Sequence, residues 1–219
     1  MFVGHYGVSF AAKRLEPAIP LWLLFVAVQW LDVVWAPLVL LGVERVRIVP
    51  GITASNPLDL YYMPYTHSLV AALAWSAAAF VMWRVVSGRR DFNAAIVIAG
   101  AVFSHWVLDF VVHRPDLPLY DNAMKVGLGL WNVAALAFGV EAALFFGGMY
   151  LYFRGGVART VPTIVFGVLM LALHAVTFFG APPASDRAAA VTALTAYIVF
   201  ALVIRFLEPR ASVQPYASA

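Results

Sequence analysis

The chain has 219 residues, of which 63% are hydrophobic and 11% charged, and its mean hydropathy is +0.88. A soluble domain is about 45–50% apolar and about 25% charged, so this composition excludes an ordinary soluble protein and indicates an integral membrane protein. The net charge of +3 comes from Lys and Arg scattered through the loops, which argues against a nucleic-acid-binding patch, and the lack of cysteine excludes disulfides and thiolate metal sites.

The first apolar segment is too short to span a bilayer. Pro17 and Pro20 break the chain just after Lys13 and Arg14, so we expect residues 2–12 to form a short half-helix that dips into the membrane. Its His5 then lies at about the depth of polar groups in later spans. A chain segment is tolerated at that depth only where protein or a water-filled cavity surrounds it.

Six later apolar stretches are each long enough to cross about 30 Å of hydrocarbon as a helix. They cover residues 21–42, 66–87, 94–113, 128–153, 161–180 and 187–207. Residues 43–65, between the first two, hold three prolines and three tyrosines, which is typical of a partly ordered segment at the membrane interface. We therefore expect one multi-pass domain over residues 1–219, an all-α integral membrane helical bundle of about six transmembrane helices plus the N-terminal half-helix.

The distribution of basic residues predicts the orientation. One side of the membrane carries nine of them: Lys13, Arg14, Arg84, Arg89, Arg90, Arg154, Arg159, Arg205 and Arg210. The other side carries five: Arg45, Arg47, Arg114, Lys125 and Arg187. The positive-inside rule then places the first side, and with it both termini, in the cytoplasm.

Ionisable side chains inside membrane spans are costly and are usually functional. In FSHWVLDFVVH, residues 103–113, His105, Asp109 and His113 are spaced by single helical turns and share one face. Imidazole and carboxylate at this spacing are a common way to hold a divalent metal from one helix. His67 and Asp32 also fall in the outer half of the membrane or close to its midplane, so we predict a metal site in a cavity that opens toward the outer face.

Three further polar residues have less specific interpretations. Glu141 lies deeper in its span, and we assign it a catalytic or proton-sharing role. His174 is interpreted as a hydrogen-bonded packing residue. Arg114 either attracts a substrate phosphate at the membrane surface or only sets the topology.

The ordered set of His5, Asp32 in QWLD, His67 in YTHS, and His105 with Asp109 in SHWVLD resembles the YdjM-like family of bacterial inner-membrane proteins. Members of that family are described as metal-dependent hydrolases. The resemblance covers residues 1–153, and its most specific parts are THS at the start of a helix and SHxxLD inside one. It implies the bacterial inner membrane, a metal-site core over residues 1–153 and an additional transmembrane hairpin over residues 154–219.

The family is similar to zinc-dependent phospholipase C and to the single-strand-specific zinc nucleases, which are helical enzymes with zinc ligands in a similar order. The resemblance implies the following metal ligands, the last being the weakest match: His5, Asp32, His67, His105, Asp109 and His113. The later His-x-x-x-Glu of the soluble enzymes is missing, and Glu141 and His174 have the wrong spacing to replace it. We therefore expect one or two ions, zinc first and manganese as the alternative.

These residues predict a hydrolase in which a metal-activated water cleaves a phosphoester or ester of a membrane lipid or lipid-linked substrate near the outer interface. Asp32 or Asp109 serves as bridging ligand or general base, and no nucleic-acid partner is expected. Three alternatives remain open: translocation of protons or metal ions, haem bound between His105 and His174, and a non-enzymatic scaffold with a structural metal. The scarcity of polar groups in the inner half favours hydrolysis over translocation.

Overall fold

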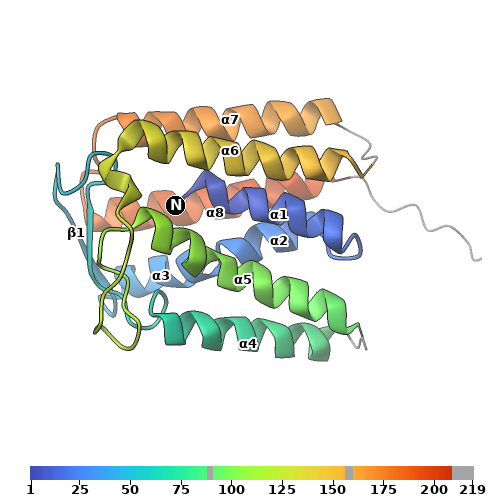
Figure 1. The fold of residues 1–219 in the computed structure, drawn as a ribbon, viewed down its shortest axis with the longest axis horizontal. Coiled ribbons are helices and arrows are strands. Elements are labelled where there is room, and N and C mark those ends of the chain that lie inside the picture. Colours follow the sequence, from blue (N-terminus) through green and yellow to red (C-terminus); the bar gives the residue numbers. More distant parts are fainter. Residues whose placement is uncertain (88–90, 156–159, 209–219) are drawn as a thin grey trace, which may run out of the picture.

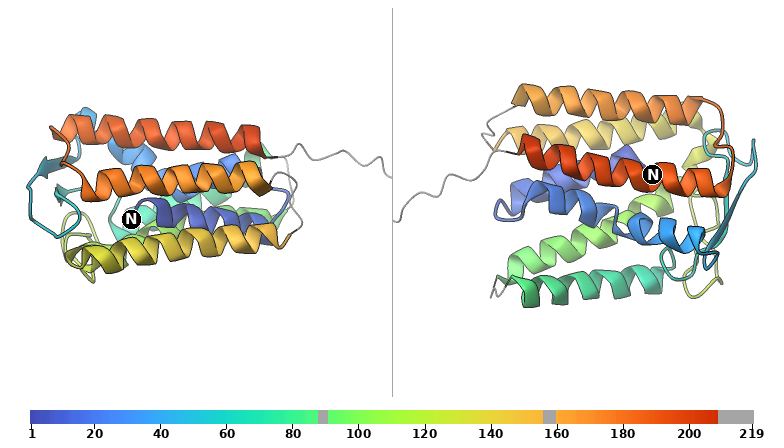
Figure 2. Two further views of the ribbon diagram at one scale, coloured as in Figure 1. Left: turned by 90° about the horizontal axis from the view of Figure 1, so that it is seen from above. Right: turned by 180° about the vertical axis from the view of Figure 1, so that it is seen from behind.

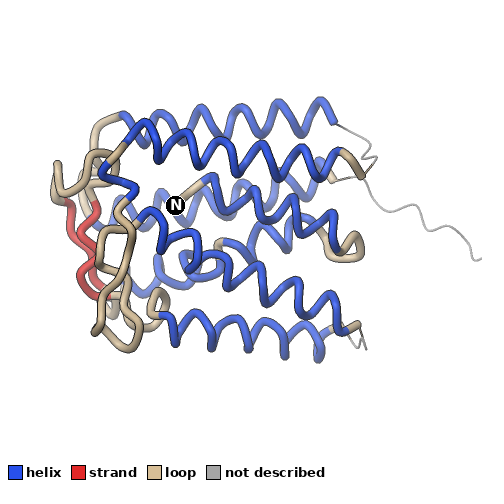
Figure 3. Tube along the Cα trace, in the orientation of Figure 1, coloured by secondary structure: helices blue, strands red, loops and turns tan. Residues whose placement is uncertain are grey.

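The computed structural model describes residues 1–87, 91–155 and 160–208. Within these ranges eight α-helices form a bundle, with a small sheet at one end (Figure 1; Figure 3). They are α1 (Val3–Leu15), α2 (Leu21–Val28), α3 (Trp30–Leu40), α4 (Leu69–Val86), α5 (Phe92–Val112), α6 (Ala134–Phe153), α7 (Thr160–Phe179) and α8 (Asp186–Leu207). Among the described residues, five helices are long and apolar enough to cross a membrane, and there are six candidates if the bent pair α2 and α3 is counted as one span. The expected all-α membrane bundle is confirmed.

The half-helix α1 lies inside the bundle, and Figure 1 shows its N-terminal end near the middle of the molecule. Its apolar side chains Val3, Tyr6 and Phe10 are fully buried, against α2, α5 and α6. The helix runs to Leu15, three residues further than expected. Lys13 in its last turn forms an ion pair with Glu208 (2.6 Å), and a cation is favourable at a helix C-terminus.

The first predicted span, residues 21–42, is broken where a single straight helix was expected. The axes of α2 and α3 differ by 55°, and the break lies at Gln29, whose Nε2 donates to the Phe2 carbonyl oxygen (3.1 Å). Helices also kink where a side chain from another element forms a hydrogen bond with a backbone carbonyl group that would otherwise bond within the helix. At this break the Val28 carbonyl oxygen lies 2.7 Å from His105 Nδ1.

Residues 43–65 form more regular structure than predicted. Strands β1 (Arg45–Ile48) and β2 (Leu58–Tyr62) pair antiparallel, with an irregular register between Arg45 and Arg47. Val46 and Leu60 are buried beneath the hairpin. The sheet closes the end of the bundle at which α3 ends and α4 begins (Figure 3).

The segment expected as one helix over residues 128–153 begins with a separate short turn. Gly129 adopts a left-handed conformation (φ 75°) and is followed by a 3₁₀ turn at Leu130–Asn132 before α6 starts at Ala134. Glycine is the residue that adopts positive φ without steric strain. The turn places Trp131 against His113, with ring centroids 4.3 Å apart.

The helix ends lie at two opposite ends of the bundle, which correspond to the two membrane sides between which the basic residues were divided. In Figure 1 the C-terminal ends of α4, α6 and α8 lie together with the N-terminal ends of α5 and α7, opposite the β-hairpin. Four of the basic residues counted on that side lie outside the described residues: Arg89, Arg90, Arg159 and Arg210. The cytoplasmic location of this end and the identity of the membrane remain predictions.

Helices α1 and α6 cross at very short range through two glycines. A Cβ atom at Gly148 would lie 2.0 Å from the Gly7 carbonyl oxygen, and one at Gly7 would lie 2.2 Å from the Leu144 carbonyl oxygen. Small residues at such crossings let two membrane helices pack backbone to backbone. The α1–α6 contact therefore holds the half-helix, and His5 with it, inside the bundle.

Gly148→Ala should destabilise the protein by about 1–3 kcal/mol, because backbone atoms on α1 cannot yield to the added methyl group. The matched control is Gly147→Ala, where an added Cβ meets no atom within 4 Å. This variant should be neutral or up to about 1 kcal/mol more stable, since alanine favours helix over glycine. Thermal unfolding in detergent measures both, and equal melting temperatures for the two variants would contradict the close crossing.

Candidate metal centre

The six residues predicted as metal ligands lie in one buried cluster. They come from α1, α3, the loop before α4, α5 and the residue after α5 in this order: His5, Asp32, His67, His105, Asp109 and His113. Each of the four histidines directs Nε2 toward an aspartate carboxylate. The expectation that distant segments converge on the histidine face of α5 therefore agrees with the fold.

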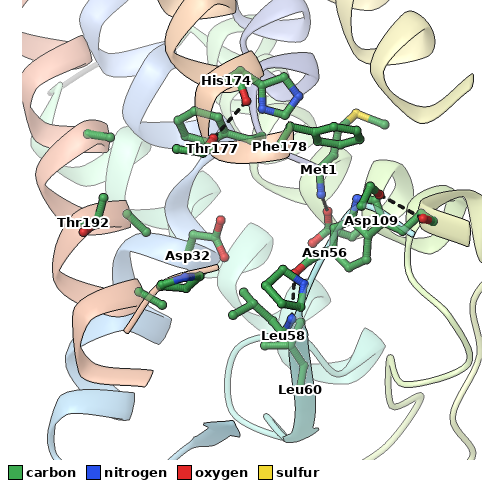
Figure 4. Close-up of a pocket in the computed structure, with 18 of the residues that line it drawn as sticks. Met1, Asp32, Asn56, Leu58, Leu60, Asp109, His174, Thr177, Phe178 and Thr192 are labelled. Carbon is green, nitrogen blue, oxygen red and sulfur yellow. Dashed lines mark hydrogen bonds and ion pairs between the residues drawn. The ribbon is translucent and has the colours of Figure 1, made fainter. Parts of the chain in front are cut away.

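Asp109 lies at the centre of the cluster, and its two carboxylate oxygens face different neighbours. Oδ1 is 3.2 Å from His5 Nε2, and Oδ2 is 3.1 Å from His105 Nε2 and 3.5 Å from His113 Nε2. The Met1 nitrogen lies 2.5 Å from Oδ1 (Figure 4). A carboxylate with both oxygens directed at separate donor groups has the arrangement of a bridging ligand.

Asp32 offers a single oxygen to the cluster. Its Oδ1 is 3.2 Å from His67 Nε2 and 3.7 Å from His105 Nε2. Its Oδ2 accepts a hydrogen bond from the Tyr197 hydroxyl (2.6 Å). Tyr197 on α8 therefore fixes the rotation of this carboxylate and leaves Oδ1 as the ligand atom.

Three of the histidines have their protons assigned by an outer hydrogen-bond partner. His105 Nδ1 lies 2.7 Å from the Val28 carbonyl oxygen, which only accepts, so Nδ1 carries the proton. His113 Nδ1 lies 2.8 Å from Asp116 Oδ1, again an acceptor. A neutral imidazole with its proton on Nδ1 has its lone pair on Nε2, so each ring in its neutral form can offer Nε2 as a metal ligand.

His67 follows the same pattern through a longer chain. The Thr66 hydroxyl donates to Glu44 Oε2 (2.6 Å) and therefore accepts from His67 Nδ1 (2.7 Å). The loop is held further because Glu44 Oε1 accepts from the backbone N–H of Thr66 (3.0 Å). Ser68 then accepts from the Ala71 N–H as the N-cap of α4, as predicted for THS at the start of a helix.

The imidazole Nε2 atoms face carboxylate oxygens in a buried site, and such contacts need a proton or a cation between them. The Met1 amino group supplies one at Asp109 Oδ1 (2.5 Å), and a metal ion bound by neutral imidazoles would supply another. Two groups have ligand atoms within 4.8 Å of one another, namely His5, His105 and Asp109, and Asp32, His67 and His105. Neutral imidazoles whose other nitrogen binds an outer acceptor are typical metal ligands. The described residues therefore fit a divalent cation with nitrogen and oxygen ligands.

His5 differs from the other three histidines. Its ring stacks on His105, with centroids 4.0 Å apart and planes 3° apart. Its Nδ1 is buried and has no hydrogen-bond partner among the described residues. Stacking and the close packing of α1, rather than an outer acceptor, orient this ring.

The cluster forms part of the wall of a cavity of about 420 Å³. Glu141 and His174 lie on the same cavity, with Glu141 Oε2 3.5 Å from His174 Nε2. Oε2 also accepts from the backbone N–H groups of Phe2 (2.8 Å) and Gly4 (3.3 Å) at the start of α1. His174 thus pairs with Glu141, whereas His105 belongs to the aspartate cluster. The catalytic role of Glu141 stays a prediction.

Arg114 does not line the cavity. Its guanidinium forms ion pairs with Asp59 on β2 and with Asp116 (3.1 Å). Because Asp116 is the outer partner of His113, these contacts connect Arg114 to the cluster indirectly. Its predicted role in binding a substrate phosphate stays a prediction.

Sequence reasoning missed the residues that hold the ligands in place. Asp116 and Thr66 carry a local signal, since each lies within three residues of a predicted histidine ligand. Tyr197 carries none, because it lies on α8 in the segment separated from the metal-site core. Both α7 and α8 line the cavity, and the division at residue 153 stays a prediction.

Comparison with protein-family models, curated proteins and solved structures found no match to this chain. The resemblance to the YdjM-like family therefore rests on the spacing of the histidine and aspartate motifs.

Thr66→Val should weaken zinc binding by about 10- to 100-fold, because it removes the acceptor that holds the proton on His67 Nδ1. The control is Thr195→Val, which removes a hydroxyl that bonds only to the Val191 carbonyl oxygen on α8. Competition titration with a chelator of known affinity measures both. Wild-type affinity in Thr66→Val would refute the role assigned to the Glu44–Thr66–His67 chain.

Proposed function

We propose that this protein is a membrane-embedded, metal-dependent hydrolase that cleaves a phosphoester or ester of a lipid. The observation that carries the proposal is the convergence of three imidazole Nε2 atoms on Asp32 and Asp109 beside a cavity. The resemblance to the YdjM-like family adds support from sequence. Zinc is the metal best suited to this mixture of imidazole and carboxylate, and manganese is the alternative.

A divalent cation held there supplies a Lewis acid and lowers the pKa of a water that it binds toward about 7. Asp109, with oxygens directed to both sides of the cluster, holds the ligand set together. Asp32 is the more accessible carboxylate, with a side chain 16% exposed against 3% for Asp109. It is therefore the carboxylate assigned as general base: its Oδ1, in place of binding the metal, would orient the attacking water and accept its proton, while the Tyr197 hydroxyl holds Oδ2.

Across the cavity, Glu141 and His174 form the second polar pair. A leaving oxygen needs a proton when a phosphoester or ester bond breaks, and His174, when protonated beside the Glu141 carboxylate, is the group assigned to supply it. In this assignment Asp32 takes up a proton on one side of the substrate and His174 supplies one on the other.

The packing beyond the cluster favours hydrolysis over translocation. Four large apolar side chains fill the bundle between the cluster and the C-terminal half of α1, and each is at most 2% exposed: Phe10, Phe25, Phe145 and Met149. A transporter needs a polar path that continues across the membrane. The buried apolar side chains named above do not provide one.

The test is hydrolysis by zinc-loaded protein in vesicles that contain phosphatidic acid, phosphatidylglycerol or a polyprenyl diphosphate, with products identified by mass spectrometry. Asp109→Asn should abolish product formation, since it removes the charge shared by the ligand set. Tyr197→Phe should slow it by about 10- to 100-fold, because Asp32 loses its outer hydrogen bond.

Tyr150→Phe is the matched control, because Tyr150 is 61% exposed on α6 and lies outside the cluster. This variant should react at the wild-type rate. The hydrolase proposal is wrong if zinc-loaded wild type releases no product from these lipids, or if Asp109→Asn and wild type release product equally fast.

A further inference from the structure

The cavity extends from the metal cluster to the space between α7 and α8. On α7 its wall includes Leu173 and Thr177, which are one helical turn apart, and on α8 it includes Ala189, Ala193 and Ala196. Both sets recur at helical spacing, so each helix turns one continuous face toward the cavity. Figure 4 shows Thr177 and Phe178 on one side of the cavity and Thr192 on another, with Asp32 between Thr192 and Asp109.

The cavity wall between these two helices includes the exposed residues Leu173 (45%) and Thr192. Its other wall residues include Asn56 and Pro183 at the β-hairpin end. Both helices are candidate membrane spans, and they also carry the exposed apolar side chains Val176 (69%) and Val191 (50%). An opening framed by exposed apolar side chains within membrane spans faces lipid chains rather than water.

The packing of α7 and α8 explains why space remains between these two helices. Helix α8 packs mainly on α2 and α3, while α7 packs mainly on α6. The two helices run side by side on one side of the bundle in both views of Figure 2. Where α8 faces α7 it carries alanines, whose methyl groups are too small to fill the space between two helices.

The groove leads directly to the proposed reaction centre. Ala196 lines it one residue before Tyr197, and the Tyr197 hydroxyl donates to Asp32 Oδ2. A molecule lying along the alanines of α8 thus meets apolar side chains over most of its length and the polar cluster at its inner end. Binding sites of about 300–1,000 Å³ accommodate small ligands, and this cavity of about 420 Å³ is within that range.

We propose that the space between α7 and α8 is a lateral entrance for a membrane lipid, whose phosphate group reaches the metal cluster past Ala193 and Ala196 while its acyl or isoprenoid chain leaves between the two helices beside Leu173 and Thr192. The inference rests on the proposed function, since an anionic headgroup beside two carboxylates requires a bound cation. The substrate is then a lipid that enters the site from the bilayer without passing through water.

The experiment uses phosphatidic acid with a photoactivatable diazirine on its acyl chain, in phosphatidylcholine vesicles that contain the zinc-loaded protein. Crosslinked peptides identified by mass spectrometry should concentrate on residues 173–181 and 189–196. Ala193→Trp should lower this crosslinking about tenfold, because the indole occupies the groove. The matched control is Ala172→Trp on the exposed side of α7, outside the cavity, and it should crosslink as wild type does.

Zinc affinity, measured in parallel, confirms that both tryptophan variants fold and separates this inference from the proposed function. Crosslinks spread evenly over α4 to α8, or unchanged by Ala193→Trp while zinc binding is intact, overturn the lateral entrance alone. Crosslinks confined to the α7–α8 groove in a protein that binds zinc but releases no product support the entrance and overturn hydrolysis.

Discussion

The burial of two carboxylates among apolar helices is the constraint on which the rest of the structure depends. Asp32 and Asp109 lie where an unpaired negative charge costs several kcal/mol. Four imidazoles surround them, and three direct Nε2 at the carboxylates while their other nitrogen contacts an outer hydrogen-bond partner. A divalent cation between the two sets of ligand atoms satisfies both the charge and the lone pairs.

Features that look like irregularities of the bundle each supply one part of this arrangement. The α2–α3 break brings the Val28 carbonyl to His105. Glu44, beside the β-hairpin, reaches His67 through Thr66, and the Arg114 contacts across that end hold Asp116 beside His113. The glycine contact between α1 and α6 keeps the half-helix inside the bundle, where His5 stacks on His105. Local departures from regular helix packing are thus concentrated around the candidate site.

The periodicity of the sequence was enough to predict the spans and the shared face of His105 and Asp109, because both follow from local helical geometry. The half-helix carrying His5 was predictable from Pro17 and the basic residues before it. The break at Gln29 was not, since it depends on contacts with α1 and α5 that are remote in sequence. The contact of Tyr197 with Asp32 spans 165 positions, and no local pattern signals such a pairing.

The most direct test of the metal centre is the zinc content of purified protein, measured by mass spectrometry after zinc loading and desalting. The account predicts about one or two zinc ions per chain. It predicts loss of zinc in His105→Ala and Asp109→Ala, and retention in His174→Ala, which alters a histidine outside the aspartate cluster. Folded wild-type protein that retains no zinc and no manganese would contradict the account.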